Sequence, residues 1–246
     1  MKLLRRLELK SANFLNEIIL KSCPLSRPCC TVRKTMISED AKYKITGLFN
    51  DLIAGIYNSA NELSLDNIFS KSKPLTLELF SNNVDEYIYF IVSQRVTKSF
   101  STRLGGVIEK VSTILVESQG GQIVPGSPNP FDLKFFHTDG KQYWIEIKSI
   151  NAQNSSNIQT INERKKLAEA HGCIFRLCMY NDDSSCAEEY KLNGSQFWKL
   201  VGGYEDAGKD MLAMLRGLAV KVSIRDIINN KVQELVQEYD ARLTHA

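Results

Sequence analysis

FDLKFFHTDGKQYWIEIKS, residues 131–149, is the stretch of the sequence that decides the fold. It has the pattern of a β-hairpin, because two runs rich in aromatic and aliphatic residues flank a short segment of turn-forming residues. Alternate side chains of a strand point to opposite faces of a sheet. Along the second run, Glu146 and Lys148 therefore share one face, while Ile145 and Ile147 share the other and pack inward.

The length of the turn decides which face of the hairpin carries Asp132. A two-residue turn at Asp139-Gly140 places Asp132 opposite Ile147, on the apolar face. A three-residue turn, Thr138-Asp139-Gly140 with a left-handed glycine, places it opposite Glu146. We expect the three-residue turn, with both carboxylates and the lysine facing a cleft. This register also gathers the apolar side chains on one face: Phe131, Leu133, Phe135, Tyr143, Ile145 and Ile147.

Two carboxylates beside a lysine predict a site for a divalent cation. Neighbouring carboxylates repel each other unless a cation joins them, and oxygen ligands of this kind suit Mg²⁺. A bound metal can polarise a phosphate ester and acidify a water, while Lys148 can stabilise the charge that develops. We expect Asp132, Glu146 and the backbone carbonyl of Ile147 to be the ligands. The structural alternative is a surface hairpin with a Glu146–Lys148 salt bridge.

Asp132 followed by Glu146-Ile147-Lys148, with Pro130 close before it, resembles the PD-(D/E)xK nuclease motif. The order helix–hairpin–strand–helix–strand over residues 102–182 is similar to the core of that superfamily. The segments STRLGGVIEKVSTILVESQGG and YWIEIKSINAQN further resemble type II restriction endonucleases of the TdeIII-like group. The resemblance implies Mg²⁺-dependent cutting of double-stranded DNA at a short palindrome by a homodimer, leaving 5′-phosphate and 3′-hydroxyl ends. It makes Asp132 and Glu146 metal ligands and Lys148 the catalytic lysine.

Glu109 is a further acidic candidate, on the helix predicted over residues 102–118. It matches the position at which many members of the superfamily place an additional acidic residue. It also lies at the edge of the apolar stripe of that helix. Glu109 therefore either joins the site or is a solvated residue that pairs with Arg103 or Lys110.

Polar and basic side chains around the motif are candidates for contacts with DNA. Such residues either bind phosphates and base edges or are ordinary loop, cap and surface residues. The candidates after the lysine are Ser149, Asn151, Asn154, Asn157, Gln159, Asn162, Arg164, Lys165 and Lys166. A second basic cluster lies on the preceding helical stretch: Arg95, Lys98 and Arg103.

The periodicities predict an α/β fold with a restriction-endonuclease-like core, a mixed central sheet flanked by helices, over residues 101–182. A helical region, 1–100, would clamp DNA or dimerise, and a helical extension, 183–246, would pack on the core. The amphipathic helix at 223–240 either contributes to a dimer or packs on its own subunit. The expected helices are 3–21, 38–60, 84–100, 102–118, 157–171 and 223–240, and 173–180 is the expected central strand.

The composition sets looser bounds. No apolar run approaches the roughly 20 residues of a membrane span, and charges interrupt the N-terminal segment where a signal peptide is apolar. We therefore expect a cytoplasmic protein with no membrane partner and with free thiols. A net charge of +3 leaves DNA binding open. Two other functions remain open: a nuclease of DNA repair, recombination or mobile elements, and a non-catalytic DNA-binding protein.

Overall fold

The predicted turn of the hairpin is present in the computed structural model of the chain. β2 (Leu133–Phe136) and β3 (Gln142–Lys148) are antiparallel, with Leu133 opposite Ile145. Gly140 has a φ angle of 78°, a left-handed conformation that glycine adopts without a steric penalty. The three-residue turn and its strand register are therefore confirmed.

The structure describes residues 37–70, 74–80, 83–126, 128–150, 155–219 and 223–244. The chain divides into two units, Met1–Lys34 and Thr35–Ala246, and every described residue belongs to the second. The helix expected at 3–21 lies outside the described residues, as do Asn151 and Asn154.

The described part of the chain is a mixed α/β structure built on a five-stranded sheet, in the order β1-β2-β3-β4-β5. β1 (Gln122–Ile123) is antiparallel to β2, whereas β4 (Ile174–Met179) and β5 (Lys191–Leu192) continue the sheet in parallel from β3. The helix α6 (Ser155–Ala170) connects β3 to β4, because parallel neighbours need a crossover connection. The sheet extends past residue 182, the expected end of the core.

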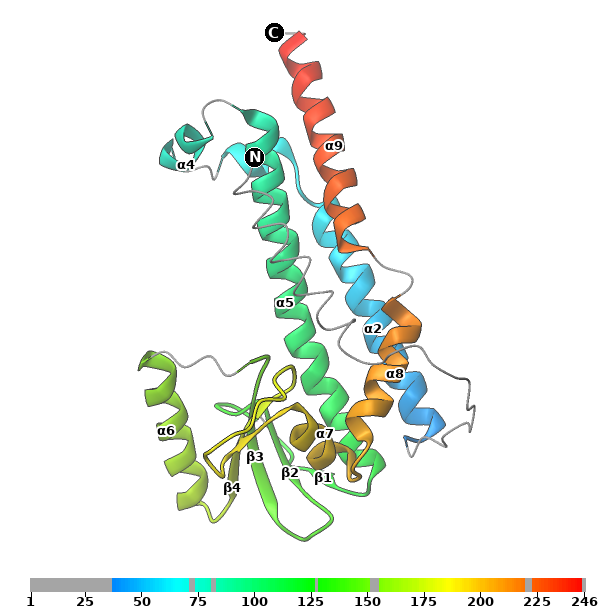
Figure 1. Ribbon diagram of the computed structural model, residues 1–246, viewed down its shortest axis with the longest axis vertical. Helices are drawn as coiled ribbons and strands as arrows, with labels where there is room; N and C mark the ends of the chain where they lie inside the picture. Colours follow the sequence, from blue (N-terminus) through cyan, green and yellow to red (C-terminus); the bar gives the residue numbers. More distant parts are fainter. Residues whose placement is uncertain are drawn as a thin grey trace. The chain divides into compact units, whose positions relative to one another are not determined.

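Helices cover both faces of the sheet. On one face, Leu133 and Ile145 join the main hydrophobic core, together with α5 (Val84–Ser118) and α7 (Gly194–Gly202). On the other face, a smaller cluster lies under α6 and includes Phe131 (Figure 1). The expectation that Phe131 shares the face of Leu133 was wrong. Its ring instead lies 4.9 Å from that of Trp144.

One continuous helix, α5, replaces the two helices expected at 84–100 and 102–118. The domain boundary predicted at residue 100 therefore falls inside this helix. Both halves of α5 bury apolar side chains, from Val92 to Val111, so packing holds the helix together through its polar middle.

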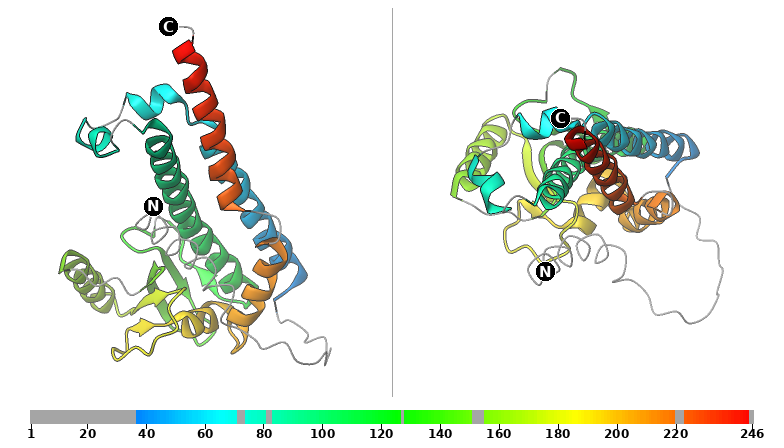
Figure 2. Two further views of the ribbon diagram at one scale, coloured as in Figure 1. Left: turned by 45° about the horizontal axis from the view of Figure 1, so that its top comes forward. Right: turned by 90° about the horizontal axis from the view of Figure 1, so that it is seen from above.

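A helical layer packs along α5, away from the sheet. α2 (Glu39–Asn61) and α9 (Ile224–Thr244) lie beside it (Figure 2). The apolar stripe of α9 belongs to the same core as α5, so the stripe packs on its own subunit. The N-terminus of α9 is capped as expected, because the Ser223 hydroxyl accepts from Asp226 N–H at 3.1 Å.

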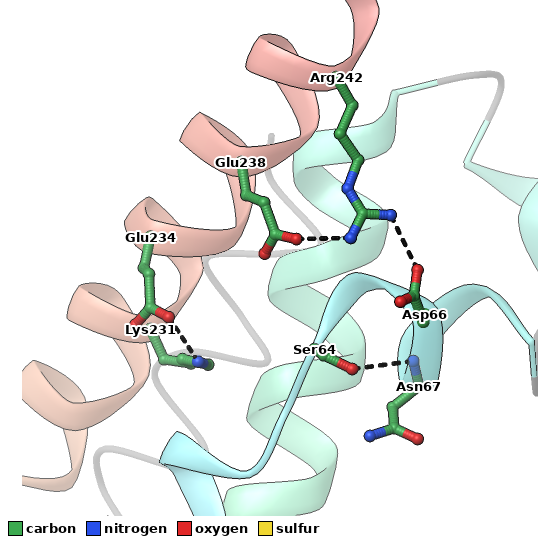
Figure 3. A network of polar contacts seen from close by, with 7 residues as sticks. All are labelled: Ser64, Asp66, Asn67, Lys231, Glu234, Glu238 and Arg242. Carbon is green, nitrogen blue, oxygen red and sulfur yellow. Dashed lines mark hydrogen bonds and ion pairs between the residues drawn. The ribbon is translucent and has the colours of Figure 1, made fainter.

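Two short helices join this layer, α3 (Leu65–Phe69) and α8 (Ala207–Ala219), whereas α4 (Pro74–Leu79) lies to one side of it (Figure 1). Arg242, near the end of α9, links α9 to α3 by bonding both Glu238 and Asp66 (Figure 3). Among the residues described, no helix is long and apolar enough to cross a bilayer.

Candidate active site

Glu146 is a buried carboxylate between two cationic side chains. It lies near the C-terminal end of β3 and is only 3% exposed. Its Oε1 atom lies 2.6 Å from Lys148 Nζ, and its Oε2 atom bonds Arg164 Nη1 of α6. The ion pair of the simple surface hairpin is thus present, but its carboxylate is buried and shared. An ionised carboxylate needs such partners once it leaves water.

Asp132 contacts the segment Glu146-Ile147-Lys148 through a backbone hydrogen bond. Its Oδ2 atom accepts a hydrogen bond from the N–H of Ile147 at 2.6 Å, and its own N–H donates to Ile145 O at 3.0 Å. Asp132 and Leu133 therefore both oppose Ile145, which is the two-against-one arrangement of a β-bulge. This replaces the direct pairing with Glu146 that the register predicted.

The bulge places Asp132 just before the first residue of β2, beside the C-terminal end of β3. The N–H and carbonyl of one strand residue point to the same neighbouring strand. Because the Ile147 N–H points to Asp132, the Ile147 carbonyl points to the same side of β3. Lys148 follows, with 47% of its side chain exposed. Glu146, Ile147 and Lys148 of β3 thus supply a carboxylate, a backbone carbonyl and an ammonium group. Asp132, beside them, supplies the second carboxylate.

Glu109, on α5, is coupled electrostatically to two residues of this group. Burial, followed by the charge of Asp132, raises the pKa of Glu109, and the charges of Lys148 and Lys110 oppose that rise. Arg103, one of the two partners suggested by the sequence, bonds the Ser59 and Ser99 hydroxyls instead. Whether Glu109 takes part in the site stays a prediction.

The oxygen atoms gathered at this site are of the chemical type that binds a hard divalent cation. Its potential ligands are carboxylate and carbonyl oxygens, which Mg²⁺ prefers. The buried Glu146 carboxylate already attracts two positively charged groups, so positive charge is stabilised at this position. Within the described ranges, however, no three His, Cys, Asp or Glu side chains converge as a metal-binding group. A metal here would use Asp132, Glu146 and the Ile147 carbonyl.

The other candidates divide between the site and the surface of α6. Arg164 lies at Glu146, whereas Lys165 lies over the ring of Tyr190, 4.9 Å from its centroid, and pairs loosely with Glu169. Asn157 is exposed on the first turns of α6. The Ser149 carbonyl accepts from the backbone N–H of Asn181 at 2.9 Å, which joins the end of β3 to the end of β4.

The contact between Arg164 and Glu146 was not predicted from the sequence. A signal was present, since Ile161, Arg164 and Ala168 have the spacing of one helix face. Ile161 and Ala168 pack on the sheet in the smaller hydrophobic cluster. An arginine between them has to reach a buried acceptor or the edge of the sheet, and Glu146 is that acceptor.

The described cysteines are not part of this group. Cys173 and Cys178 are buried free thiols and Cys186 is half-buried and free, as expected for each. Burial raises the pKa of the Cys178 thiol, which disfavours the reactive thiolate. The remaining three cysteines, Cys23, Cys29 and Cys30, lie outside the described residues.

Comparisons with known proteins add no family to this description. A scan of the chain against models of protein families gives no match. A search for similar sequences among curated proteins gives none either.

Proposed function

We propose that the chain is a metal-dependent DNA endonuclease whose active site comprises Asp132, Glu146 and Lys148, with Glu109 beside them. One observation carries the proposal: the Asp132 carboxylate bonds the backbone of the central residue of Glu146-Ile147-Lys148. Asp132 and the segment Glu146-Ile147-Lys148, from the two arms of the hairpin, thereby meet at one end of the sheet. This combination of acidic and basic groups is suited to phosphodiester hydrolysis.

Each side chain has a distinct task in the proposed reaction. Asp132, Glu146 and the Ile147 carbonyl would hold Mg²⁺, which supplies Lewis-acid activation of the phosphate and of a bound water. Lys148, half-exposed, orients the attacking water and stabilises negative charge on the phosphate. Glu109, coupled electrostatically to Asp132 and Lys148, is the further acidic group that could accept or return a proton.

Arg164 completes the charge balance of the site. In the absence of metal its guanidinium neutralises Glu146. A cation bound to the same carboxylate would compete with this ion pair. Arg164, released, would carry its charge and its planar donors to a phosphate oxygen.

The finer version of the proposal is a type II restriction endonuclease. Such an enzyme acts on both strands of a palindrome as a homodimer and leaves 5′-phosphate and 3′-hydroxyl ends. It rests on the resemblance of residues 101–121 and 143–154 to that group. A PD-(D/E)xK nuclease of repair or recombination would use the same active site on branched or damaged DNA.

A cleavage assay tests the proposal. Plasmid, phage and branched DNA are incubated with the protein and Mg²⁺, beside an EDTA control and the variants Lys148→Ala and Asp132→Asn. Lys141→Ala, an exposed lysine in the hairpin turn, is the matched control and is expected to cut like the wild type. Discrete bands support a restriction enzyme, and cutting of branched DNA alone supports a repair nuclease. If the wild type cuts no DNA in Mg²⁺, the proposal is wrong.

A further inference from the structure

A basic groove lies on α5, outside the candidate active site. The hollow has a volume of about 410 Å³, and its lining residues in the described part of the chain come from this helix: Arg95, Lys98, Ser99, Thr102 and Arg103. Three of the five are cationic and two carry hydroxyl groups. None of these five described residues is a carboxylate, so they give the hollow a positive charge.

Within the described ranges, the two arginines of this basic groove bond neutral groups. The Arg103 guanidinium donates to the hydroxyls of Ser59 and Ser99, and Arg95 donates to the Asn67 carbonyl. Among the described residues, no ion pair involves Arg95, Lys98 or Arg103. Both arginines are thus oriented by neutral groups and keep their full charge for an anionic partner.

A line drawn from the groove along one face of α5 leads to Glu109. An α-helix has 3.6 residues per turn, so Arg95, Lys98, Thr102, Gly106 and Glu109 follow one another along a line. Lys98 and Thr102 are exposed on this line. At a rise of about 1.5 Å per residue, the groove begins about 9 Å from Glu109 and ends about 21 Å from it.

Two glycines lie between the groove and Glu109. Gly105 and Gly106 occupy the interior of a helix, where glycine is less stable than alanine. A Cβ atom at either position would meet nothing within 4 Å, so packing within the described chain does not require them. Glycine also permits close approach of a ligand to the backbone. An elongated partner that lies along α5 would explain both residues.

Duplex DNA has the matching charge spacing. Each strand carries one phosphate per about 3.4 Å of helix axis, so the groove spans phosphates roughly three to six positions from the scissile one. We propose that the groove of Arg95, Lys98 and Arg103 binds the phosphate backbone of duplex DNA, which passes over Gly105-Gly106 to the active site. This inference rests on the proposed nuclease function and adds a second contact with the same substrate.

Binding at different salt concentrations tests the groove without cleavage. The affinity of the full-length protein for a fluorescent duplex of about 30 base pairs is measured in EDTA between about 50 and 200 mM KCl. Removing one charged side chain that binds a phosphate lowers the slope of log Kd against log salt by about one. Lys98→Gln/Arg103→Gln is expected to bind at least about tenfold more weakly, with the slope reduced by about two.

Two controls separate the groove from general effects. Lys209→Gln/Arg225→Gln removes the same charge from exposed positions on α8 and α9 and is expected to bind like the wild type. Gly106→Gln is expected to weaken binding without lowering the melting temperature. Gly217→Gln, exposed with open space on α8, is expected to leave binding unchanged, also without lowering the melting temperature. Equal slopes for the two double variants would overturn the proposal, as would equally tight binding of polyglutamate.

The outcomes also separate this inference from the proposed function. Cleavage by the wild type with unchanged binding by the Lys98→Gln/Arg103→Gln variant overturns the groove and leaves the nuclease standing. Groove-dependent binding without any cleavage in Mg²⁺ overturns the nuclease and keeps the groove as a DNA-binding surface. Failure of both results rejects both proposals.

Discussion

The Oδ2 atom of Asp132 lies 2.6 Å from the backbone nitrogen of Ile147, whose N–H donates to it. The same side chain therefore holds the end of the hairpin and supplies one of the proposed metal ligands. Because the bond needs only an acceptor oxygen and the metal needs negative charge, the two roles can be separated by mutation.

Asp132→Asn keeps an acceptor oxygen and removes the charge. We expect its free energy of unfolding in urea to lie within about 1 kcal/mol of the wild type. Asp132→Ala leaves the Ile147 N–H without this partner and is expected to cost about 1–3 kcal/mol. Both variants should lose any rise in melting temperature that Mg²⁺ gives the wild type. Equal stability of the two variants would show that the bond contributes nothing.

Arg164→Ala leaves the buried Glu146 with Lys148 as its remaining ion-pair partner. Loss of a charged hydrogen bond predicts a destabilisation of about 2 kcal/mol in urea unfolding. Lys166→Ala, an exposed lysine of the same helix, is the control and should change stability by less than about 0.5 kcal/mol. Adding Glu146→Gln to Arg164→Ala should recover part of the loss, and no recovery would count against the ion pair as its cause.

Gly140→Ala tests the turn that sets the register. At a φ of 78° a Cβ atom is strained, although it would meet no neighbour within 4 Å. The expected loss is about 1 kcal/mol, smaller for Gly140→Asn. Gly217→Ala, in a helix and also with open space, is expected to stabilise the protein by up to about 1 kcal/mol. Urea unfolding measures all three, and an unchanged Gly140→Ala would argue against backbone strain.

Glu109→Gln tests the raised pKa of Glu109. A carboxyl with a higher pKa in the folded state binds more protons folded than unfolded, so its contribution to stability falls as pH rises above its ordinary value of about 4.5. The variant lacks this titration. It should therefore gain stability relative to the wild type as pH rises from about 4 to 7, as measured by urea unfolding. A stability difference independent of pH would contradict the assignment.

The hairpin register could be predicted because two independent constraints agreed. Only the three-residue turn placed Leu133 and Phe135 beside Ile145 and Tyr143. The same turn needs a residue in the left-handed conformation, and Gly140 stands at that position. Alternation within β3 likewise separated Glu146 from Ile145 reliably. Both are short-range regularities that the sequence displays directly.

The bulge at Asp132 could not be predicted in the same way. It depends on Phe131 turning to the α6 face to pack on Trp144, a choice between two apolar surfaces that periodicity does not distinguish. The continuity of α5 was hidden for a related reason. Its polar middle, near Ser101, resembles a helix boundary locally, but tertiary packing on either side keeps the helix intact.

Because α5 is unbroken, the basic groove and Glu109 have a fixed angular phase as well as a fixed spacing. One residue inserted between Arg103 and Glu109 would turn the groove by about 100° away from the site. Seven inserted residues would restore its direction to within about 20°, but about 10 Å farther away. A short insertion or deletion in this part of the chain therefore changes the direction of the groove relative to Glu109 more than it changes the distance between them.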